Sequence, residues 1–336
     1  MRAFVVAGAN EASVRDWPTP SRVADETIVT PLLAGVCGTD LELIDATIDP
    51  TYVRYPLVLG HEWVGQLLEP AEGIGPPGTR VVVEGVVPCG VCDCCRRGAT
   101  NLCATYDEIG FTRPGALADL ISVPTRLVHA IGTDVSLDDA VLIEPMAVVW
   151  RALSRFPLAP RARVAVVGDG TIALLSAHMV RLFDPRVIDV IGRRSEQRDL
   201  ALRAGATSFH VNPTAESYDL VIQASGSIDG VASALARCDR GGMVILLGLP
   251  PHGSHVELAP DDVVNNDLVI QGSFSYTSEA FTEVVRRVNQ LDLQPSFLIT
   301  HRFDLEHASD AVAALRGVQA GEARGKVVIA MPAHHA

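Results

Sequence analysis

Four cysteines in one short segment have the spacing of a metal-binding loop. Cys89, Cys92, Cys95 and Cys103 are separated by two, two and seven residues. Thiolates are soft ligands, and four of them close a tetrahedral zinc site that has no open position. A ferredoxin-type cluster has its fourth cysteine after three residues and before a proline, whereas Cys103 is followed by Ala104. The loop is therefore predicted to bind a structural zinc ion.

The number and positions of the cysteines indicate which of them can bind zinc and in which compartment the protein is expected. Cys94 lies in the same segment and could replace a neighbour, so the choice among Cys92, Cys94 and Cys95 is open. The chain has an odd number of cysteines, seven, and most of them are clustered, whereas a disulfide framework spreads its cysteines more widely. Since no cleavage-site pattern precedes Trp17 either, we expect a cytoplasmic protein.

Cys37, His61 and Glu62 are a second, dispersed set of possible metal ligands. Each has an ordinary explanation when it is taken alone. These explanations are a buried small hydrophobic residue, a satisfied core histidine and a surface acid. Their positions in the sequence alone therefore do not establish a site.

A glycine-rich turn between a strand and a helix predicts a dinucleotide site. The apolar run Val164–Val167 is followed by Gly-Asp-Gly-Thr-Ile-Ala at positions 168–173 and then by a helical pattern. The glycines permit a tight turn, and the free N–H groups of the helix N-terminus bind a pyrophosphate. The alternative is an ordinary glycine-rich turn. The residues assigned to the cofactor here are Gly168, Gly170, Thr171 and Ile172.

The end of the next strand predicts which nicotinamide cofactor is bound. Asp189 follows the turn by about 20 residues, as a ribose-binding acid does, but it lies inside the apolar run Val187–Ile191. That run ends in Gly192-Arg193-Arg194. Two guanidinium groups match a 2′-phosphate through charge-assisted, bidentate hydrogen bonds, so we favour NADP over NAD. The alternative is a solvated arginine pair, with Asp189 or the backbone holding the ribose.

The chain length and a change in the pattern of apolar runs predict two domains. At roughly 150 residues per domain, 336 residues suggest about two. The first part has short strand-like runs, such as Arg80–Val87, typical of an irregular all-β or α+β domain. From Arg163, apolar runs alternate with helical stretches, which indicates a doubly wound parallel sheet. The predicted segments are 1–149, 150–291 and 292–336, and the last folds back onto the first.

Six strands are expected in the parallel sheet, over Val164–Val167, Val187–Ile191, Ser208–Val211, Leu220–Gln223, Met243–Leu247 and Leu268–Gln271. Its helices are expected over Thr171–Phe183, Glu196–Arg203, Ile228–Arg237 and Ser278–Gln290.

Charge and hydropathy restrict the partners to small molecules. With 27 basic and 40 acidic residues the net charge is −13, which repels phosphate backbones, so no nucleic acid is expected. The longest apolar stretches, such as Met243–Leu249, are far shorter than the roughly 20 residues of a membrane-spanning helix. No membrane partner is expected either.

Together these residues resemble the zinc-dependent medium-chain alcohol and polyol dehydrogenases. The resemblance covers essentially the whole chain, and it implies an α/β protein with an N-terminal GroES-like, β-rich catalytic domain and a Rossmann domain built on a doubly wound parallel sheet. It rests on Cys37-Gly38-Thr39-Asp40, Gly60-His61-Glu62, the four-cysteine loop, Ile143-Glu144-Pro145 and the turn at Gly168.

The resemblance also implies the catalytic residues. Cys37 and His61 would bind a catalytic zinc, Glu62 would complete or support the ligand set, and Glu144 would be a further ligand, direct or through water. With the cysteine loop, this implies two zinc ions per chain. Such a zinc polarises the oxygen of an alcohol whose hydride passes to NAD(P), and Thr39 would be the first proton acceptor.

The substrate class follows from finer resemblances. Glu144 replaces the cysteine of classical alcohol dehydrogenases and points to the branch of sorbitol, threonine and glucose dehydrogenases, while residues 60–63 and 108–112 are similar to aminocyclitol dehydrogenases. We expect a secondary hydroxyl or ketone of a polyol, sugar or (amino)cyclitol to react. The predicted substrate contacts are Glu42, Trp63, Glu108 and Phe111. Trp63 and Phe111 are equally suited to a core, and Glu108 to covering the cysteine loop.

Several alternatives remain at this stage. The substrate could be L-threonine or a simple secondary alcohol, or the enzyme could be a biosynthetic ketoreductase. Quinone and enone reductases of the same fold lack the set Cys37, His61 and Glu62, which argues against them. A more remote alternative is an inactive, zinc-stabilised binding protein. The resemblance further implies a homodimer or homotetramer with the strand Leu268–Gln271 near a subunit interface.

Overall fold

The computed structural model describes residues 1–155, 157–211, 215–317 and 321–332. They form two compact units. One unit holds the described parts of 1–144, 276–320 and 326–336, and the other holds those of 145–275 and 321–325. Residues 333–336 of the predicted C-terminal segment lie outside the described residues. We call the two units the catalytic unit and the nucleotide unit.

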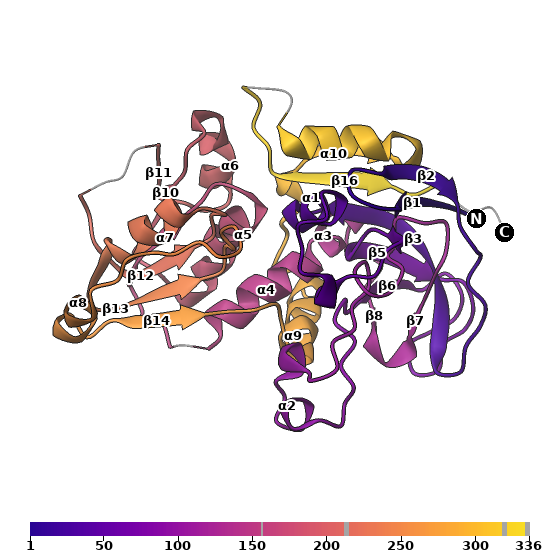
Figure 1. Ribbon diagram of the computed structural model, residues 1–336. Helices are drawn as coiled ribbons and strands as arrows, with labels where there is room; N and C mark the ends of the chain where they lie inside the picture. The colour runs from indigo at the N-terminus through magenta and orange to yellow at the C-terminus, as the bar shows by residue number, and fades with distance from the viewer. Residues whose placement is uncertain (156, 212–214, 318–320, 333–336) are drawn as a thin grey trace. The chain divides into compact units, whose positions relative to one another are not determined.

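The nucleotide unit contains a parallel six-stranded sheet in the order β11-β10-β9-β12-β13-β14 (Figure 1). This order is that of a classic doubly wound domain, whose ligands bind beyond the carboxyl ends of the strands where the order reverses. The reversal falls at β9, and the predicted doubly wound α/β fold is confirmed. The strands are β9 (Arg163–Val167), β10 (Val187–Ile191), β11 (Ser208–His210), β12 (Tyr218–Gln223), β13 (Cys238–Leu246) and β14 (Val269–Gly272).

Buried strands and capped helices make the core of this unit. Residues 164–167 of β9 are buried on both faces of the sheet, as parallel strands covered by helices require. Ala165 packs with Ala234 of α7 (Ile228–Leu235), and Ser227 caps that helix by accepting from the Gly230 N–H at 3.2 Å. The other helices are α4 (Ile143–Leu153), α5 (Thr171–Val180), α6 (Arg198–Arg203) and α8 (Pro260–Asn265).

The catalytic unit is built on a mostly antiparallel sheet in the order β15-β16-β3-β5-β6-β8, with β7 also paired to β3. A smaller sheet has the order β2-β1-β4. The main strands are β3 (Glu26–Val36), β5 (Glu62–Leu67), β6 (Arg80–Val83), β7 (Ile121–Pro124), β8 (Val128–Ala130), β15 (Ile299–Asp304) and β16 (Lys326–Ala330). The smaller sheet has β1 (Arg2–Val6), β2 (Ala12–Asp16) and β4 (Leu57–Val58).

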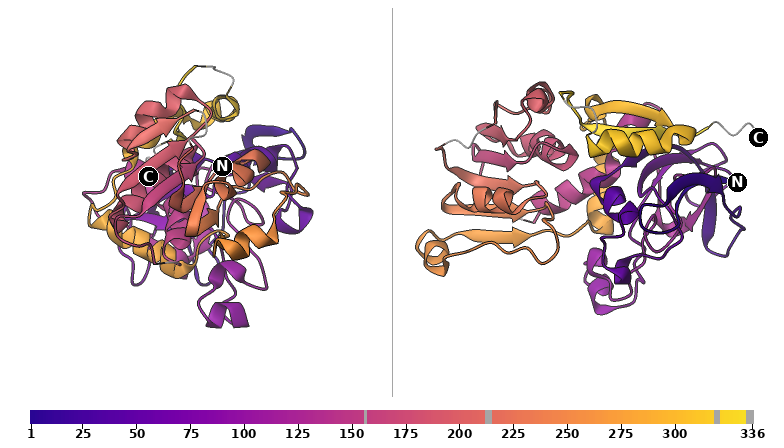
Figure 2. Two further views of the ribbon diagram at one scale, coloured as in Figure 1. Left: turned by 90° about the vertical axis from the view of Figure 1, so that its left-hand side faces the viewer. Right: turned by 45° about the horizontal axis from the view of Figure 1, so that its top comes forward.

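The end of the chain returns to the catalytic unit. Strand β16 pairs antiparallel with β3, and α10 (Ala308–Arg316) lies along β15 and β16 (Figure 2). The C-terminal strands β15 and β16 thereby extend a sheet whose other strands come from the first part of the chain.

The boundaries of the units differ from the predicted ones at 149/150 and 291/292. The structure divides the chain after Glu144 and after Ser275, so α9 (Ser278–Asn289) belongs to the catalytic unit. The reason is tertiary packing, since the Phe281 ring lies 5.2 Å from the ring of His129 and 5.4 Å from that of Tyr276. The helical pattern of α9 could not indicate which domain its apolar face covers.

Some predicted elements are shorter than the apolar runs that suggested them. The run Arg80–Val87 forms a strand only to Val83. Beyond it, the Gly85 N–H is donated to the Tyr276 hydroxyl oxygen at 2.8 Å instead of to a neighbouring strand. A side chain remote in sequence thus satisfies the Gly85 N–H beyond the end of the strand.

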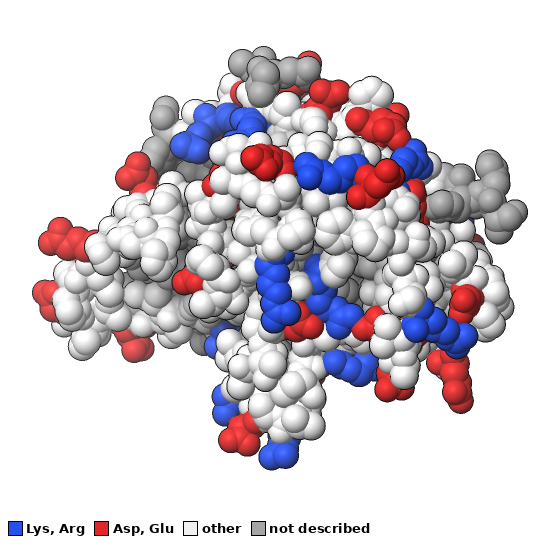
Figure 3. Space-filling model, turned by 45° about the vertical axis from the view of Figure 1, so that its right-hand side comes forward, with Lys and Arg blue, Asp and Glu red and all other residues white. Residues whose placement is uncertain are grey.

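Two general features concern the exterior. No helix of the described residues is long and apolar enough to cross a membrane. Acidic and basic side chains are intermingled over the face drawn in Figure 3.

The packing of α9 leads to a stability prediction. Replacing Phe281, which is fully buried, by alanine should lower the free energy of unfolding by about 3–5 kcal/mol, because it leaves a cavity between α9 and His129. Urea unfolding measures the change. The control is Val264→Ala in α8, where the side chain is 76% exposed and the expected change is within about 0.5 kcal/mol. Equal effects of the two substitutions would contradict the assignment of α9 to the core of the catalytic unit.

Candidate functional site

The sulfur atoms of the cysteine loop converge on one point. One ligand atom each from Cys89, Cys92, Cys95 and Cys103 lies within 4.8 Å of the others. Backbone N–H groups, that of Ala104 first, lower the pKa of Cys92 to about 6, which favours the thiolate that zinc requires. The convergent set is the one the spacing predicted.

Cys94 is not a member of this convergent set among the described residues. Its sulfur instead accepts a hydrogen bond from the guanidinium of Arg97 at 3.2 Å. The geometry therefore favours Cys92 and Cys95 over Cys94 as ligands.

Cys37, His61 and Glu62 form the second convergent group. Their potential ligand atoms lie within 4.8 Å of one another, with His61 and Glu62 buried. Cys37 occupies the junction between β3 and α1 (Gly38–Ile44), while His61 and Glu62 come at the start of β5, which pairs with β3. A thiol, an imidazole and a carboxylate are the donor types of a zinc site with an open position. We call this group the buried ligand set.

Asp40 orients the buried ligand set. Its Oδ1 lies 3.4 Å from His61 Nδ1, and its Oδ2 accepts the Cys37 backbone N–H at 2.8 Å. Burial lowers the pKa of His61, but Asp40 and then Cys37 outweigh it and hold that pKa well above its usual value. A carboxylate beside one imidazole nitrogen favours metal binding at the other, as is typical of metal-binding histidines.

Lys326 pairs with Glu62 inside the protein. The Lys326 ammonium forms an ion pair with Glu62 Oε2, and both side chains are 2% exposed. Burial lowers the pKa of Lys326, but the charge of Glu62 outweighs it, so the pKa is raised and the lysine is charged. Gly35 lies between them, because a Cβ there would be 2.5 Å from Glu62 Oε2 and 2.6 Å from Lys326 Cε.

Two further carboxyl groups lie close to the buried ligand set. Burial raises the pKa of Glu108 to about 7, and burial followed by the charge of Glu62 raises that of Glu144 to about 8. Glu144 is not within the 4.8 Å group of the described residues, although it senses the charges of His61 and Glu62. Carboxyl groups that repel one another in an apolar environment are stabilised by a dication, so the set fits zinc.

The other predicted site residues are placed as follows. Thr39 is half-buried, with Oγ1 3.8 Å from Cys37 Sγ. Glu42 is exposed on α1. Trp63 follows Glu62 on β5, so its side chain lies on the opposite face of the sheet, within the hydrophobic core. Phe111 is also a core residue, and its ring packs 5.2 Å from that of His61. The prediction that Trp63 contacts substrate is thus not favoured by its position.

The glycine-rich turn of the nucleotide unit has room for a phosphate. Gly168 has φ +135°, and a Cβ there would be 2.8 Å from the Ala224 carbonyl oxygen. At Gly170, the N-cap of α5, a Cβ would meet nothing within 4 Å. Open space in front of a helix N-terminus fits the pyrophosphate of a dinucleotide. Thr171 and Ile172 begin the helix, as predicted.

Asp189 is engaged inside the sheet. Its carboxylate accepts from the Tyr218 hydroxyl at 2.9 Å and from the Ser208 hydroxyl at 2.5 Å. A buried carboxylate that is already hydrogen-bonded to side chains of β11 and β12 does not hold a ribose. This alternative for the cofactor ribose is therefore disfavoured.

Asp169 holds the strand tip where the two arginines lie. Its Oδ2 accepts the backbone N–H groups of Arg193 at 2.8 Å and of Arg194 at 3.0 Å. Its Oδ1 accepts the Arg194 guanidinium at 2.8 Å. Despite the opposing effect of burial, these donors hold the pKa of Asp169 below its usual range. Arg194 is therefore bound to the glycine turn itself, and Arg193 is exposed.

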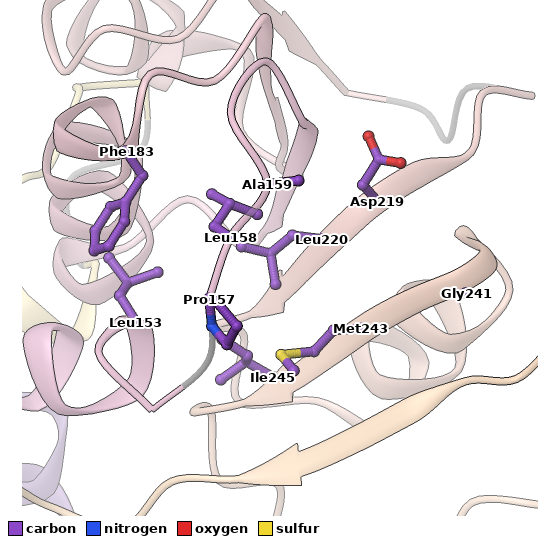
Figure 4. A pocket seen from close by; sticks show the side chains of 10 residues that line it. All are labelled: Leu153, Pro157, Leu158, Ala159, Phe183, Asp219, Leu220, Gly241, Met243 and Ile245. Carbon is purple, nitrogen blue, oxygen red and sulfur yellow. The ribbon is translucent and has the colours of Figure 1, made fainter.

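An apolar pocket on the nucleotide unit lies away from the glycine turn (Figure 4). Asp219 and Leu220 line it near the amino end of β12, whereas Gly168 follows the carboxyl end of the parallel strand β9. Asp219 is its one carboxylate, and this accepts the Arg163 N–H at 2.7 Å. None of its lining residues belongs to the predicted site.

Three residues that contact the predicted site residues were missed from the sequence. Asp40 belonged to a quoted motif but had no role, and Asp169 was counted only as a turn residue. Lys326 had one available signal, since it is the only lysine in the 336 residues and it begins an apolar strand. Its partner could not be inferred, because Glu62 lies in the first part of the chain.

The buried ion pair leads to a prediction about Lys326→Met. This change should lower the free energy of unfolding by about 3–5 kcal/mol, because it leaves Glu62 charged and unpaired in the interior. Chemical denaturation measures the loss. The double variant Lys326→Met, Glu62→Gln should lose less than the single one, since no charge is then stranded. A single variant as stable as the wild type would refute the importance of the pair.

Comparison with known proteins agrees with this geometry. The sequence model of the alcohol dehydrogenase GroES-like domain matches residues 23–133, and that of the glucose dehydrogenase C-terminus matches residues 137–319. The sorbitol dehydrogenase of Bacillus subtilis (strain 168) is 27% identical over 331 residues, covering 93% of this chain and 92% of that protein. The L-threonine 3-dehydrogenase of Streptomyces avermitilis is 30% identical over 337 residues, covering 94% of each.

Solved structures extend the similarity to three dimensions. The crystal structure of a zinc-binding dehydrogenase from Sinorhizobium meliloti 1021 bound to NADP has a TM-score of 0.89 and 26% identity, covering 98% of each chain. The predicted family is thus confirmed by sequence and by fold. The chain belongs to the zinc-dependent medium-chain dehydrogenases, a family of NAD(P)-dependent oxidoreductases that act on alcohols and polyols.

Proposed function

We propose that this enzyme transfers a hydride between NADP and a secondary hydroxyl or ketone of a polyol, sugar or (amino)cyclitol. The observation that carries the proposal is the buried ligand set of Cys37, His61 and Glu62, in a chain that also has an open glycine turn. An enone or quinone reductase has no use for such a set. A binding protein without activity would need neither that set nor the turn.

Two zinc ions per chain are part of the proposal. Cys89, Cys92, Cys95 and Cys103 hold the structural ion, and Cys37, His61 and Glu62 hold the catalytic one, with Glu144 as a further ligand, direct or through water. When bound, the catalytic zinc lowers the pKa of an alcohol and so prepares it for hydride loss. Asp40 keeps the His61 ring in its ligating orientation. Lys326 offsets the negative charge of Glu62.

Thr39 is the proposed first proton acceptor. Its hydroxyl is half-buried and lies beside Cys37, so it reaches both the ligand set and the exterior. A hydroxyl both donates and accepts, and it can therefore pass on a proton without carrying a charge. Glu42, exposed on the same helix, is a candidate next member of this relay.

NADP is favoured over NAD because the strand tip after β10 is basic. Arg193 and Arg194 stand where NAD-dependent enzymes place an acid. Asp189, the acid that the sequence offers for the ribose, is used within the sheet. The Sinorhizobium protein of similar fold holds NADP, which agrees with this proposal.

Polyhydroxylated substrates are favoured over simple alcohols because polar groups lie beside the ligand set. Glu108 and Glu144 are carboxyl groups with raised pKa values, so they can donate as well as accept hydrogen bonds near neutral pH. A site that hydrogen-bonds hydroxyls rejects analogues that lack them. L-Threonine is the second candidate substrate, because the Streptomyces avermitilis relative is an L-threonine 3-dehydrogenase.

A homodimer or homotetramer in the cytoplasm completes the proposal. Strand β14 is at the edge of the parallel sheet, Val269 on it is 40% exposed, and unpaired edge strands are ready to pair with another chain. Clustered free cysteines are kept available for metal in a reducing compartment.

Substitution of single cysteines separates the two zinc sites. Cys37→Ser should lower kcat/KM by about 1,000-fold or more with little change in Tm, because the open site serves chemistry. Cys103→Ser should lower Tm by roughly 5–10 °C, because the closed site holds a loop. Each variant should lose one zinc by elemental analysis. Cys94→Ser is the matched control and should keep both ions; the reverse pattern of Tm and activity would overturn the assignment.

The substrate class is tested by reduced-nicotinamide absorbance with NADP and with NAD. The substrate series runs from secondary alcohols through threonine and polyols to aldoses and cyclitols. The expected kcat/KM is about a hundredfold or more higher for a polyhydroxylated substrate than for a simple secondary alcohol. Highest activity with threonine would select the second candidate. If zinc-replete protein showed no activity with any substrate, in either direction, the proposed substrate class would be refuted.

A further inference from the structure

The segment 321–325 joins the nucleotide unit although it follows α10 and precedes β16 of the catalytic unit. Gln197, fully buried, holds it in place. Its side-chain oxygen accepts the Arg324 N–H at 2.7 Å, and its amide nitrogen donates to the Arg324 carbonyl oxygen at 2.8 Å. The Thr171 hydroxyl donates to the Gly325 carbonyl oxygen at 3.0 Å. The segment is therefore fixed to the first turn of α5.

Gln197 also connects Arg324 to the strand tip. The same amide nitrogen that bonds Arg324 donates to the Asp169 carbonyl oxygen at 2.5 Å. Two carbonyl groups bonded by one nitrogen lie close together, so the backbone of residue 324 is beside the glycine turn. Asp169 in turn binds Arg193 and Arg194. Asp169 is thus linked to the backbone of Arg193, to the side chain of Arg194 and, through Gln197, to the backbone of Arg324.

Arg324 and Arg194 lie close enough for their positive charges to repel each other. Burial lowers the pKa of Arg324 first, and the positive charge of Arg194 lowers it further, while Asp169 acts in the opposite direction. Asp169 is already bound to Arg194 through its side chain. Two guanidinium groups that repel each other at one corner would be stabilised by an anion between them.

Arg194 is poorly placed to select the cofactor by itself. Its Nη2 donates to Asp169 Oδ1 at 2.8 Å and to the Asp169 carbonyl oxygen at 3.0 Å, and its Nε donates to the same Oδ1 at 3.1 Å. These bonds fix the strand tip to the turn. Arg194 is thus first a positioning residue.

We propose that Arg324, together with Arg193, recognises the 2′-phosphate of NADP and determines the preference for it, while Arg194 holds the strand tip. The inference rests on the proposed use of NADP. A guanidinium binds phosphate through paired, charge-assisted hydrogen bonds, and two of them from different segments enclose a dianion better than one. Arg324 is thus a specificity residue supplied by the end of the chain.

The test uses the full-length, zinc-replete protein and two probes without a nicotinamide. Calorimetry compares adenosine 2′,5′-bisphosphate, which has the 2′-phosphate, with ADP, which lacks it. Arg324→Gln should weaken the bisphosphate about tenfold or more and change ADP less than about twofold, because one charge-assisted interaction is lost. Arg324→Lys should restore part of the affinity. The backbone bonds to Gln197 remain in both variants.

The matched control is Arg240→Gln. Arg240 is exposed and lies near the amino end of β13, whereas the glycine turn lies at the carboxyl ends of the parallel strands. The substitution removes the same charge and should leave both probes unchanged. If the wild type binds the two probes equally, the proposed NADP preference itself fails. If the wild type discriminates and Arg324→Gln still does so equally well, or loses both probes alike, the role of Arg324 is refuted while NADP use stands.

Discussion

The ion pair between Glu62 and Lys326 is the constraint on which the catalytic unit depends. Gly35 of β3 is the register partner of both Glu62 on β5 and Val328 on β16, and its missing side chain leaves the space where the lysine and the carboxylate meet. Separated charges in this interior would be costly, so the pair requires β16 to be in place. The end of the chain therefore supplies the cation that neutralises one member of the ligand set.

The carboxyl groups around this pair have different electrostatic environments. Glu62 forms an ion pair with Lys326, whereas burial raises the pKa values of Glu108 and Glu144 towards neutrality. The cysteine loop is bonded to the same unit through Ser278 of α9. The Ser278 hydroxyl donates to the buried Glu84, and the Ser278 backbone N–H donates to the Thr100 hydroxyl within the loop. Structural and reactive parts thus share one hydrogen-bonded framework.

Much of the fold was predictable because its signals are local. Five-residue apolar runs spaced by helical stretches require a parallel sheet, and all six predicted strands are present. Glycines at 168 and 170 serve a turn within one segment. The limit appears at α9, whose pattern predicts a helix but not the domain that it covers, and at Gly85, whose N–H bonds the remote Tyr276 hydroxyl instead of a neighbouring strand.

The sequence by itself determined the donor chemistry of this protein: four thiolates in one loop, a nucleotide turn, and thiol, imidazole and carboxylate ligand types. Spacing within a short segment nearly fixes geometry, so such sites can be read from the sequence. Only the tertiary structure decided which groups meet across the chain. Lys326 reaches Glu62, and the backbone of Arg324 reaches the turn at Asp169, because sheet pairing and the hydrogen bonds of Gln197 bring together residues that are far apart in the sequence.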